Sequence, residues 1–190
     1  MAVTSIMIVG VGGQGTLLAS KILGSVAVSQ GYDVKLSEVH GMAQRGGSVV
    51  TYVKYGDKVF SPIIAPGGAD IILAFEELEA SRWANYCKKD GTLIVNTQKI
   101  DPMPVVTGAK KYPVESTNQL AQNQIRFITV DALSLAKQAG TVKAVNVVLI
   151  GVLAKSSDIG KEIWLECIRN TVPEKFLEMN LKAFELGYNV

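Results

Sequence analysis

Histidine and cysteine are scarce in this chain of 190 residues, which has one histidine, His40, and two cysteines, Cys87 and Cys167. Two cysteines are too few to ligate an iron–sulfur cluster or to build a multi-cysteine zinc site. Because they also show no pairing pattern, they favour a reducing, cytoplasmic location. The sequence therefore predicts no metal site, and no residue in it stands out as catalytic.

Charged residues make up only 19% of the chain, against about 25% in an average soluble protein. The 19 basic and 17 acidic residues leave a net charge of +2, which excludes a nucleic-acid binder with a basic stripe. Hydrophobic residues reach 48%, which excludes a disordered chain. Length and composition together predict a single folded domain over residues 1–190 with a large core.

The sequence has no long hydrophobic run and no leader pattern. Met1–Gly10 lacks the basic residues that open a signal peptide and leads directly into a glycine-rich turn. The longest strongly apolar run, Val145–Ala154, is about half the length of a membrane span and contains Asn146. We therefore expect neither a secretory leader nor contact with a membrane.

Short apolar segments alternate with segments of helical periodicity along most of the chain. Strands are expected over Val3–Val9, Tyr32–Leu36, Asp70–Phe75, Thr92–Asn96 and Arg126–Val130, and a β-hairpin over Ser48–Tyr55 and Lys58–Phe60 with Gly56-Asp57 as its turn. Helices are expected over Gln14–Gln30, Glu76–Tyr86, Ser116–Gln122, Asp131–Gln138, Val142–Lys155, Lys161–Asn170 and from Pro173 to Gly187. This order predicts a three-layer α/β/α fold with a mostly parallel sheet, a Rossmann-like start, a β-hairpin insertion and a helical C-terminal tail.

A glycine-rich turn between the first strand and the first helix fits the pattern G-x-G-x-x-G and is the strongest candidate for a binding site. Its residues include Gly10, Gly12, Gly13, Gln14 and Gly15. In this pattern Gly10 allows the tight turn, Gly12 lets the backbone approach a phosphate, and Gly15 lets the helix pack closely on the strand. The free N–H groups at the start of the helix then face an anion.

Three interpretations of this turn stay open from the residues alone. A NAD site needs an acidic residue at the end of the second strand, but Asp33 stands at the start of that expected strand and Glu38 stands beyond its end. The turn can instead bind another phosphate-bearing ligand or cofactor tail. In the third interpretation the glycines serve only a tight strand-to-helix connection.

A second group of candidate residues follows the second strand. The loop from Glu38 combines this acid and His40 with Arg45, Gly46 and Gly47. It lies at the carboxyl edge of the predicted sheet, where parallel α/β folds bind ligands. Arg45 offers a forked donor to a phosphate or carboxylate beside flexible backbone. In the alternative interpretation, Arg45 only pairs with Glu38 in a surface turn.

Four further residues carry weaker signals. His40 has no assignable nucleophile or orienting carboxylate, so a structural or interface role is favoured over that of a general base. Cys87 stands beside two lysines that favour the thiolate, although isolated cysteines are usually inert. Glu76 is expected at a helix N-terminus, where its charge is favourable. Asn146 lies in an apolar helix and is expected to find a partner in the core, at an interface or in the glycine turn.

Several motifs together resemble the gamma-type subunit of 2-oxoacid:ferredoxin oxidoreductases, and within that family most of all the beta subunit of the indolepyruvate enzymes. They are the Gly10–Gly15 turn, Arg45-Gly46-Gly47, Ser61-Pro62, the strand from Ala69-Asp70 to Phe75-Glu76, the helix Asn146–Lys155, Val172-Pro173-Glu174-Lys175, and Asn180 with Ala183-Phe184-Glu185 and Gly187-Tyr188. Their order and spacing cover nearly the whole chain, least over Asp101–Gln124.

The resemblance implies a reaction and a division of labour. Such complexes decarboxylate an aryl 2-oxoacid on thiamine diphosphate, pass two electrons through iron–sulfur clusters to ferredoxin, and release an acyl-CoA. This chain has no Gly-Asp-Gly thiamine signature and too few cysteines for the clusters. The resemblance places both groups on a larger alpha subunit, so we expect this chain to hold no cofactor alone and to be inactive in isolation. It would contribute to the coenzyme A side through the glycine turn and the Arg45 loop, and use part of its uncharged surface as a subunit interface.

Two other functions stay open. A free-standing NAD(P)-dependent oxidoreductase would use Gly10–Gly15, but the acid is misplaced and the chain has no separate substrate domain. A nucleotide-binding module without turnover would have no thiamine-enzyme partner.

Overall fold

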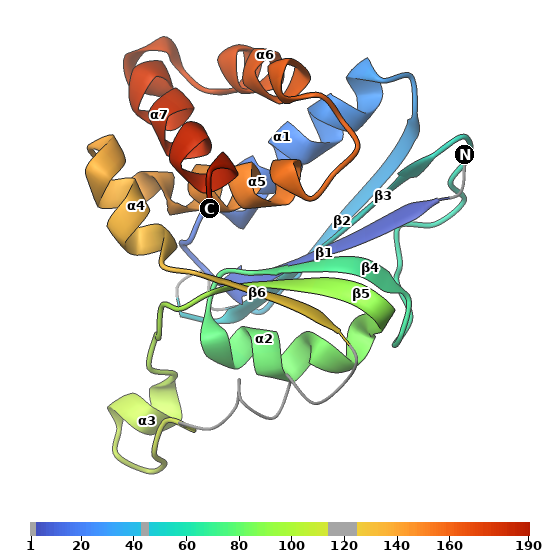
Figure 1. The fold of residues 1–190 in the computed structure, drawn as a ribbon. Coiled ribbons are helices and arrows are strands. Elements are labelled where there is room, and N and C mark those ends of the chain that lie inside the picture. The colour runs from blue at the N-terminus through green and yellow to red at the C-terminus, as the bar shows by residue number, and fades with distance from the viewer. Residues whose placement is uncertain (1–2, 43–45, 114–124) are drawn as a thin grey trace.

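The computed structural model describes residues 3–42, 46–113 and 125–190, in which six strands form one mixed sheet of order β2-β3-β1-β4-β5-β6 (Figure 1). The strands are β1 (Thr4–Val11), β2 (Asp33–His40), β3 (Ser48–Gly56), β4 (Ala69–Ala74), β5 (Cys87–Asn96) and β6 (Arg126–Val130). Strands β1, β4, β5 and β6 run parallel, whereas β3 pairs antiparallel with both β1 and β2. Strand β2 therefore runs in the same direction as these four strands, and the carboxyl ends of all five lie at one edge of the sheet.

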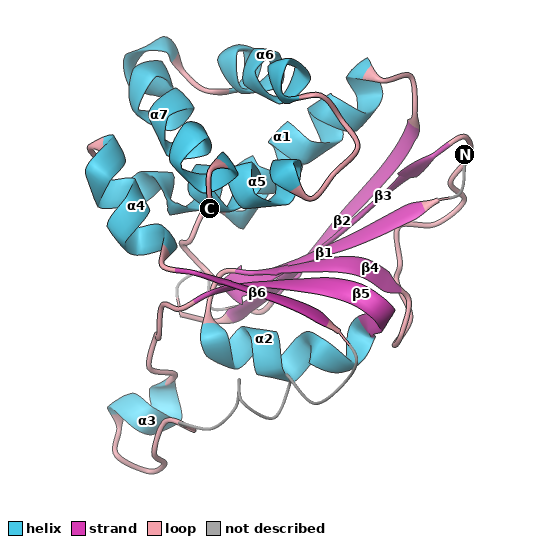
Figure 2. Ribbon diagram, viewed as in Figure 1, coloured by secondary structure: helices cyan, strands magenta, loops and turns pink. Residues whose placement is uncertain are grey.

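Helices cover both faces of this sheet (Figure 2). They are α1 (Thr16–Ser29), α2 (Glu77–Trp83), α3 (Met103–Val106), α4 (Ala132–Ala139), α5 (Val145–Lys155), α6 (Lys161–Thr171) and α7 (Leu177–Tyr188). On one face, α1 and α4–α7 lie over a core that includes Ile6 and Leu73; on the other, α2 lies over a core that includes Met7 and Ile72. Neighbouring strand residues enter opposite cores because strand side chains alternate. The predicted three-layer α/β/α fold and helical C-terminal tail are confirmed.

The predicted hairpin of Ser48–Tyr55 with Lys58–Phe60 is wrong in its second strand. Strand β3 pairs instead with β1 and β2, and residues 58–60 are not a strand. The carboxylate of Asp33 accepts a hydrogen bond from the N–H of Val59 at 2.8 Å, which ties this segment to the start of β2. Residue 57 lies in a bend, and the partner of strand β3 is set by packing across the sheet and not by the local turn signal.

The structure differs from the prediction in two further respects, the end of β2 and the presence of helix α3. Strand β2 continues to His40, four residues past its predicted end, because it pairs with β3 as far as His40 opposite Val49. The short helix α3 has no counterpart among the predicted helices. The helix predicted over Ser116–Gln122 lies outside the described residues.

Helix α5 is central to the helical layer, and every residue in it before Lys155 is buried. The last helix was predicted to stop at Gly187, but α7 continues to Tyr188. Gly187 is a helical residue at the contact between α7 and α5. A Cβ at Gly187 would overlap the backbone of Val148. Among the described residues, no helix is long and apolar enough to cross a membrane.

Candidate functional site

The glycine-rich turn joins β1 to α1 at the carboxyl edge of the sheet. Gly15 precedes the first helical residue with φ = 83°, a left-handed conformation that favours glycine, and no side chain caps the helix. Among the described residues, no acceptor binds the N–H groups of Gly13, Gly15, Thr16 or Leu17. The start of α1 therefore offers several free donors and the positive end of the helix dipole, which together suit an anion.

Gln14 fixes the shape of the turn through its side-chain amide. Its Oε1 accepts a hydrogen bond from the N–H of Val11 at 2.8 Å, and its Nε2 donates to the carbonyl of Phe75 at 3.0 Å. The same carbonyl accepts from Nδ2 of the buried Asn96 at 3.0 Å. Gly10 leaves room for this brace, since a Cβ there would lie 2.9 Å from both Gln14 Oε1 and the Cβ of Phe75. The ends of β1, β4 and β5 thus hold the turn in one conformation.

The sequence pattern predicted that Gly15 lets the helix pack closely on a strand. In the structure Gly15 instead lies against α5. Asn146 Nδ2 donates a hydrogen bond to the carbonyl of Gly15 at 3.2 Å, and a Cβ on Gly15 would lie 2.6 Å from that nitrogen. Of the partners expected for Asn146, the glycine turn is the one that the structure supplies. The helix start is therefore positioned by a residue 131 positions away in the sequence.

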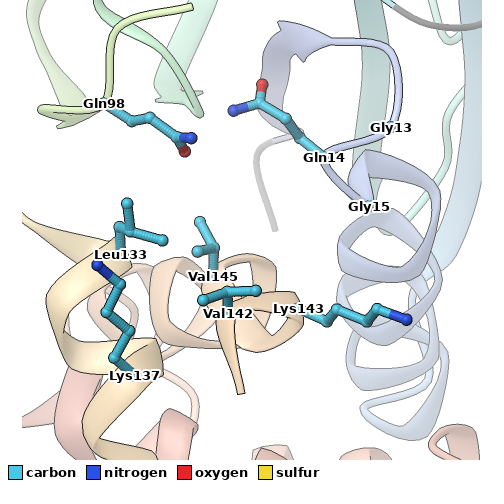
Figure 3. Close-up of a pocket in the computed structure, with 9 residues that line it drawn as sticks. All are labelled: Gly13, Gln14, Gly15, Gln98, Leu133, Lys137, Val142, Lys143 and Val145. Atoms are coloured by element: carbon cyan, nitrogen blue, oxygen red, sulfur yellow. The ribbon is translucent and has the colours of Figure 1, made fainter.

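A pocket of about 600 Å³ opens beside the turn (Figure 3). It is lined by Gly13, Gln14, Gly15, Gln98, Leu133, Lys137, Val142, Lys143 and Val145. Figure 3 shows the amides of Gln14 and Gln98 turned toward each other on one side, with Lys137 on α4 and Lys143 in the 3₁₀ turn Val142–Ala144 on the other. Two cationic side chains and a helix N-terminus around one pocket are suited to phosphate or carboxylate groups.

Sequence reasoning missed the three polar lining residues outside the turn, Gln98, Lys137 and Lys143. They come from three separate segments, and none stands in a recognisable motif. The signal for Gln98 was its place two residues after the expected end of a strand at Asn96, which puts it at the carboxyl edge. The two lysines carried no such signal, because Lys137 lies within α4 and Lys143 lies in the 3₁₀ turn before α5, and only packing decides how these helices face the pocket.

A second pocket, of about 270 Å³, lies on the other side of the turn and contains Glu38 and His40. Glu38 was predicted to lie beyond the end of the second strand. Because β2 runs to His40, Glu38 lies within the strand, near its carboxyl end. Its carboxylate accepts a hydrogen bond from Thr51 Oγ1 at 3.1 Å. His40 is exposed, with Nδ1 3.0 Å from the carbonyl of Gly41. Strand β3 lies between β2 and β1, so the strand that carries Glu38 is not adjacent to the strand that leads into the glycine turn. Glu38 nevertheless lines the same pocket as Gly12 and Thr16.

The loop after β2 is brought onto the glycine turn by its last residues. The N–H of Gly12 donates to the carbonyl of Gly47 at 2.8 Å, and the N–H of Gly46 donates to the carbonyl of Gly12 at 3.4 Å. Next to them, Ser48 Oγ donates to the buried carboxylate of Glu79 at 2.5 Å. The structure therefore brings Gly46 and Gly47 together with Gly12, while Arg45 lies outside the described residues.

The remaining candidates have structural surroundings. Glu76 is buried at the start of α2, where its carboxylate accepts a hydrogen bond from the N–H of Glu79 at 3.0 Å, as expected of a helix N-terminus. Burial raises the pKa of the Cys87 thiol to about 11, and the nearby Asp70 adds to the rise. Both cysteines are buried and free, and no group of three metal-ligating side chains occurs in residues 3–42, 46–113 and 125–190. These residues do not fit an iron–sulfur cluster.

The fold and the turn define a Rossmann-like α/β domain with a glycine-rich connection from its first strand to its first helix. The gamma subunit of a keto/oxoacid ferredoxin oxidoreductase from Geobacter sulfurreducens has the same fold, with a TM-score of 0.74 at 24% identity over 98% of this chain and 96% of that chain. A family model described as pyruvate ferredoxin/flavodoxin oxidoreductase matches residues 5–190. The chain belongs to this family.

Two curated relatives place the chain within the family. It is 44% identical over 188 residues to the indolepyruvate oxidoreductase subunit IorB of Pyrococcus horikoshii, covering 96% of this chain and 93% of the relative. It is 29% identical over 187 residues to the ketoisovalerate oxidoreductase subunit VorA of Methanothermobacter marburgensis, covering 96% of this chain but 35% of that polypeptide. The chain is thus homologous to whole IorB subunits and to one part of a longer subunit.

Proposed function

We propose that residues 1–190 form one gamma-type domain that acts as the small, non-redox subunit of an indolepyruvate ferredoxin oxidoreductase. In this assignment a larger alpha subunit holds thiamine diphosphate and the iron–sulfur clusters. The complex oxidatively decarboxylates an aryl 2-oxoacid to an acyl-CoA and passes two electrons to ferredoxin. The chain alone is colourless and inactive, because its described residues offer neither a cluster site nor a catalytic constellation.

The observation that carries this proposal is the pocket of about 600 Å³ at the start of α1. The turn with its free N–H groups lines this pocket together with Lys137 and Lys143, so it suits the phosphates of coenzyme A. The amides of Gln14 and Gln98 offer further donors and acceptors for a pantetheine chain.

We assign the ligand-contacting role to the turn and its neighbours. The proposed binding residues are Gly10, Gly12, Gly13, Gln14, Gly15, Glu38, Arg45, Gly46 and Gly47, to which the pocket adds Gln98, Lys137 and Lys143. Gly10 acts indirectly, by admitting the Gln14 brace. Glu38 belongs to the smaller pocket, where it is suited to hydroxyl or amino groups and not to phosphate.

The test is CoA-dependent ferredoxin reduction by the co-expressed complex with indolepyruvate as substrate. Replacing Lys137 or Lys143 by glutamate is expected to raise the KM for coenzyme A about tenfold or more, since each change replaces an attractive charge by a repulsive one. Lys175→Glu, an exposed lysine in the turn before α7, is the matched control and should leave the KM unchanged. Full activity of the larger subunit without this chain would overturn the assignment of an essential subunit.

The smaller pocket favours a second candidate function, a nucleotide-binding module. Glu38 faces the turn from the carboxyl end of β2, a position from which an acid can bind ribose hydroxyls. Enhancement of NADH fluorescence by the chain at micromolar cofactor, abolished by Glu38→Ala, would support it. Absence of binding together with CoA-dependent activity of the complex would exclude it.

A further inference from the structure

Residues 99–113 form an arm that is held to the body of the domain at both ends. Near one end, the N–H of Ile100 donates to Glu76 Oε1 at 3.1 Å; near the other, the hydroxyl of Tyr112 donates to the same oxygen. Glu76 is 1% exposed, so both anchors are attached to a rigid, buried carboxylate at the start of α2. Lys99 adds an ion pair with Glu77 at 3.3 Å and lies 5.9 Å from the centre of the Tyr112 ring.

The middle of the arm is organised by its own backbone. The N–H of Val106 donates to the carbonyl of Pro102 at 3.1 Å, that of Thr107 to Met103 at 2.9 Å, and that of Lys110 to Pro104 at 2.9 Å. Helix α3 lies within this segment and stands apart from the sheet and the other helices (Figure 1). The arm is therefore already shaped before any partner arrives, which removes the ordering cost that a disordered segment would add to binding.

This arm exposes apolar side chains without a core of its own. None of the residues of α3 is buried, and Met103 and Val106 are 68% and 65% exposed. The two stand three residues apart on a helical turn, so they project from the same side. An ordered, protruding apolar surface of this kind is typical of an interaction site.

Charge and position indicate which partner fits. Lys110 and Lys111 follow the apolar pair and form no ion pair within the described residues, while Asp101 is the arm's one acid. Gln98, directly before the arm, lines the large pocket at the start of α1. A partner that holds the arm would therefore border this pocket.

We propose that the arm, residues 99–113, is the docking element for the larger subunit, which receives Met103 and Val106 in an apolar groove with an acidic rim. The inference rests on the proposed function. It also assigns the larger subunit a place beside Gln98, where it closes the open side of the pocket. In VorA the region homologous to this chain is about a third of one polypeptide, so a domain of this kind can be joined covalently to further sequence.

Binding of the purified chain to the tagged larger subunit, measured by biolayer interferometry, tests the proposal. The double variant Met103→Asp/Val106→Asp is expected to weaken binding at least a hundredfold, because two charges would enter an apolar groove. Lys110→Glu/Lys111→Glu should weaken it about tenfold at low salt and less at high salt. The matched control, Phe60→Asp/Ile63→Asp, changes residues that are 85% and 56% exposed in the segment after β3, at the opposite edge of the sheet, and should bind like the wild type.

The outcomes separate the two proposals. Wild-type affinity of the Met103→Asp/Val106→Asp variant, or equal loss in the Phe60→Asp/Ile63→Asp control, would overturn the docking arm. Failure of the wild-type chain to bind the larger subunit would overturn the proposed function itself. Circular dichroism and thermal unfolding should be unchanged in all variants, because every altered side chain is exposed.

Discussion

The amide of Asn146 in α5 and the carbonyl of Gly15 at the start of α1 are joined by a hydrogen bond of 3.2 Å across 131 residues of sequence. The bond is possible because Gly15 has no Cβ, which would lie 2.6 Å from the amide nitrogen. The start of α1 is thereby held at a fixed distance from the helical layer that carries Val145 and Lys143 into the large pocket. The geometry of the anion-binding end of α1 thus depends on a helix–helix contact.

Gly15→Ala is expected to destabilise the chain more than Gly13→Ala. Both glycines have positive φ, which costs an alanine about 1–2 kcal/mol, but a Cβ on Gly13 has no atom within 4 Å. The alanine at position 15 also displaces Asn146, which adds about 1 kcal/mol or more for the lost hydrogen bond. Urea unfolding measures both free energies. In the Asn146→Ala background, Gly15→Ala and Gly13→Ala should lower the free energy of unfolding by similar amounts. A difference as large as in the wild-type background would show that Asn146 is not the cause.

Gln14→Glu is expected to lower the free energy of unfolding by about 1–3 kcal/mol at pH 7, because a carboxylate cannot donate to the carbonyl of Phe75. The protonated glutamic acid can donate, so the loss should shrink as the pH falls toward 4. Urea unfolding at several pH values checks this dependence, with the exposed Gln138→Glu as control. A loss that does not change with pH would show that the Phe75 contact is not the cause.

Both cysteines are expected to resist alkylation in the folded chain. Burial raises the pKa of Cys87 to about 11 and raises that of Cys167, so at pH 8 only about one Cys87 in a thousand is a thiolate. Mass spectrometry after iodoacetamide treatment should find no label on the native chain and two labels in urea. A cysteine placed at the exposed Ser61 should react within minutes. Rapid labelling of native Cys87 would contradict its burial.

Asp131→Ala is expected to cost about 1 kcal/mol at pH 7, because Asp131 caps α4 by accepting a hydrogen bond from the N–H of Ser134 at 2.9 Å. The side-chain and backbone hydrogen bonds of Ser134 lower the pKa of this carboxyl below its usual value of 3.8. Its contribution is therefore complete above pH 3.8 and is lost as the pH falls through the lowered pKa. Urea unfolding at pH 7 and pH 3 tests this, with Asp101→Ala as control; an equal cost at both values would contradict it.

Local signals predicted elements well where the structure is decided locally. Strand β6 has the predicted bounds Arg126–Val130, and Asp131 caps the following helix as its side chain and position indicated. The prediction failed for the partner of Ser48–Tyr55, because any buried, β-branched strand satisfies the same pattern whichever strand lies beside it. The extension of β2 to His40 has the same origin, since it follows from pairing with β3.

By itself the sequence determined the layers of the fold, the glycine turn at the end of β1 and the family to which the chain is similar, because periodicity and motif order are properties of nearby residues. Only the tertiary structure decided what surrounds that turn. The brace from Gln14 to Phe75, the contact of Asn146 with Gly15, and the place of Lys137 and Lys143 beside the pocket all join distant segments. The scarcity of histidine and cysteine can be read from the sequence. The pocket on which the proposed role depends forms only when distant segments pack together.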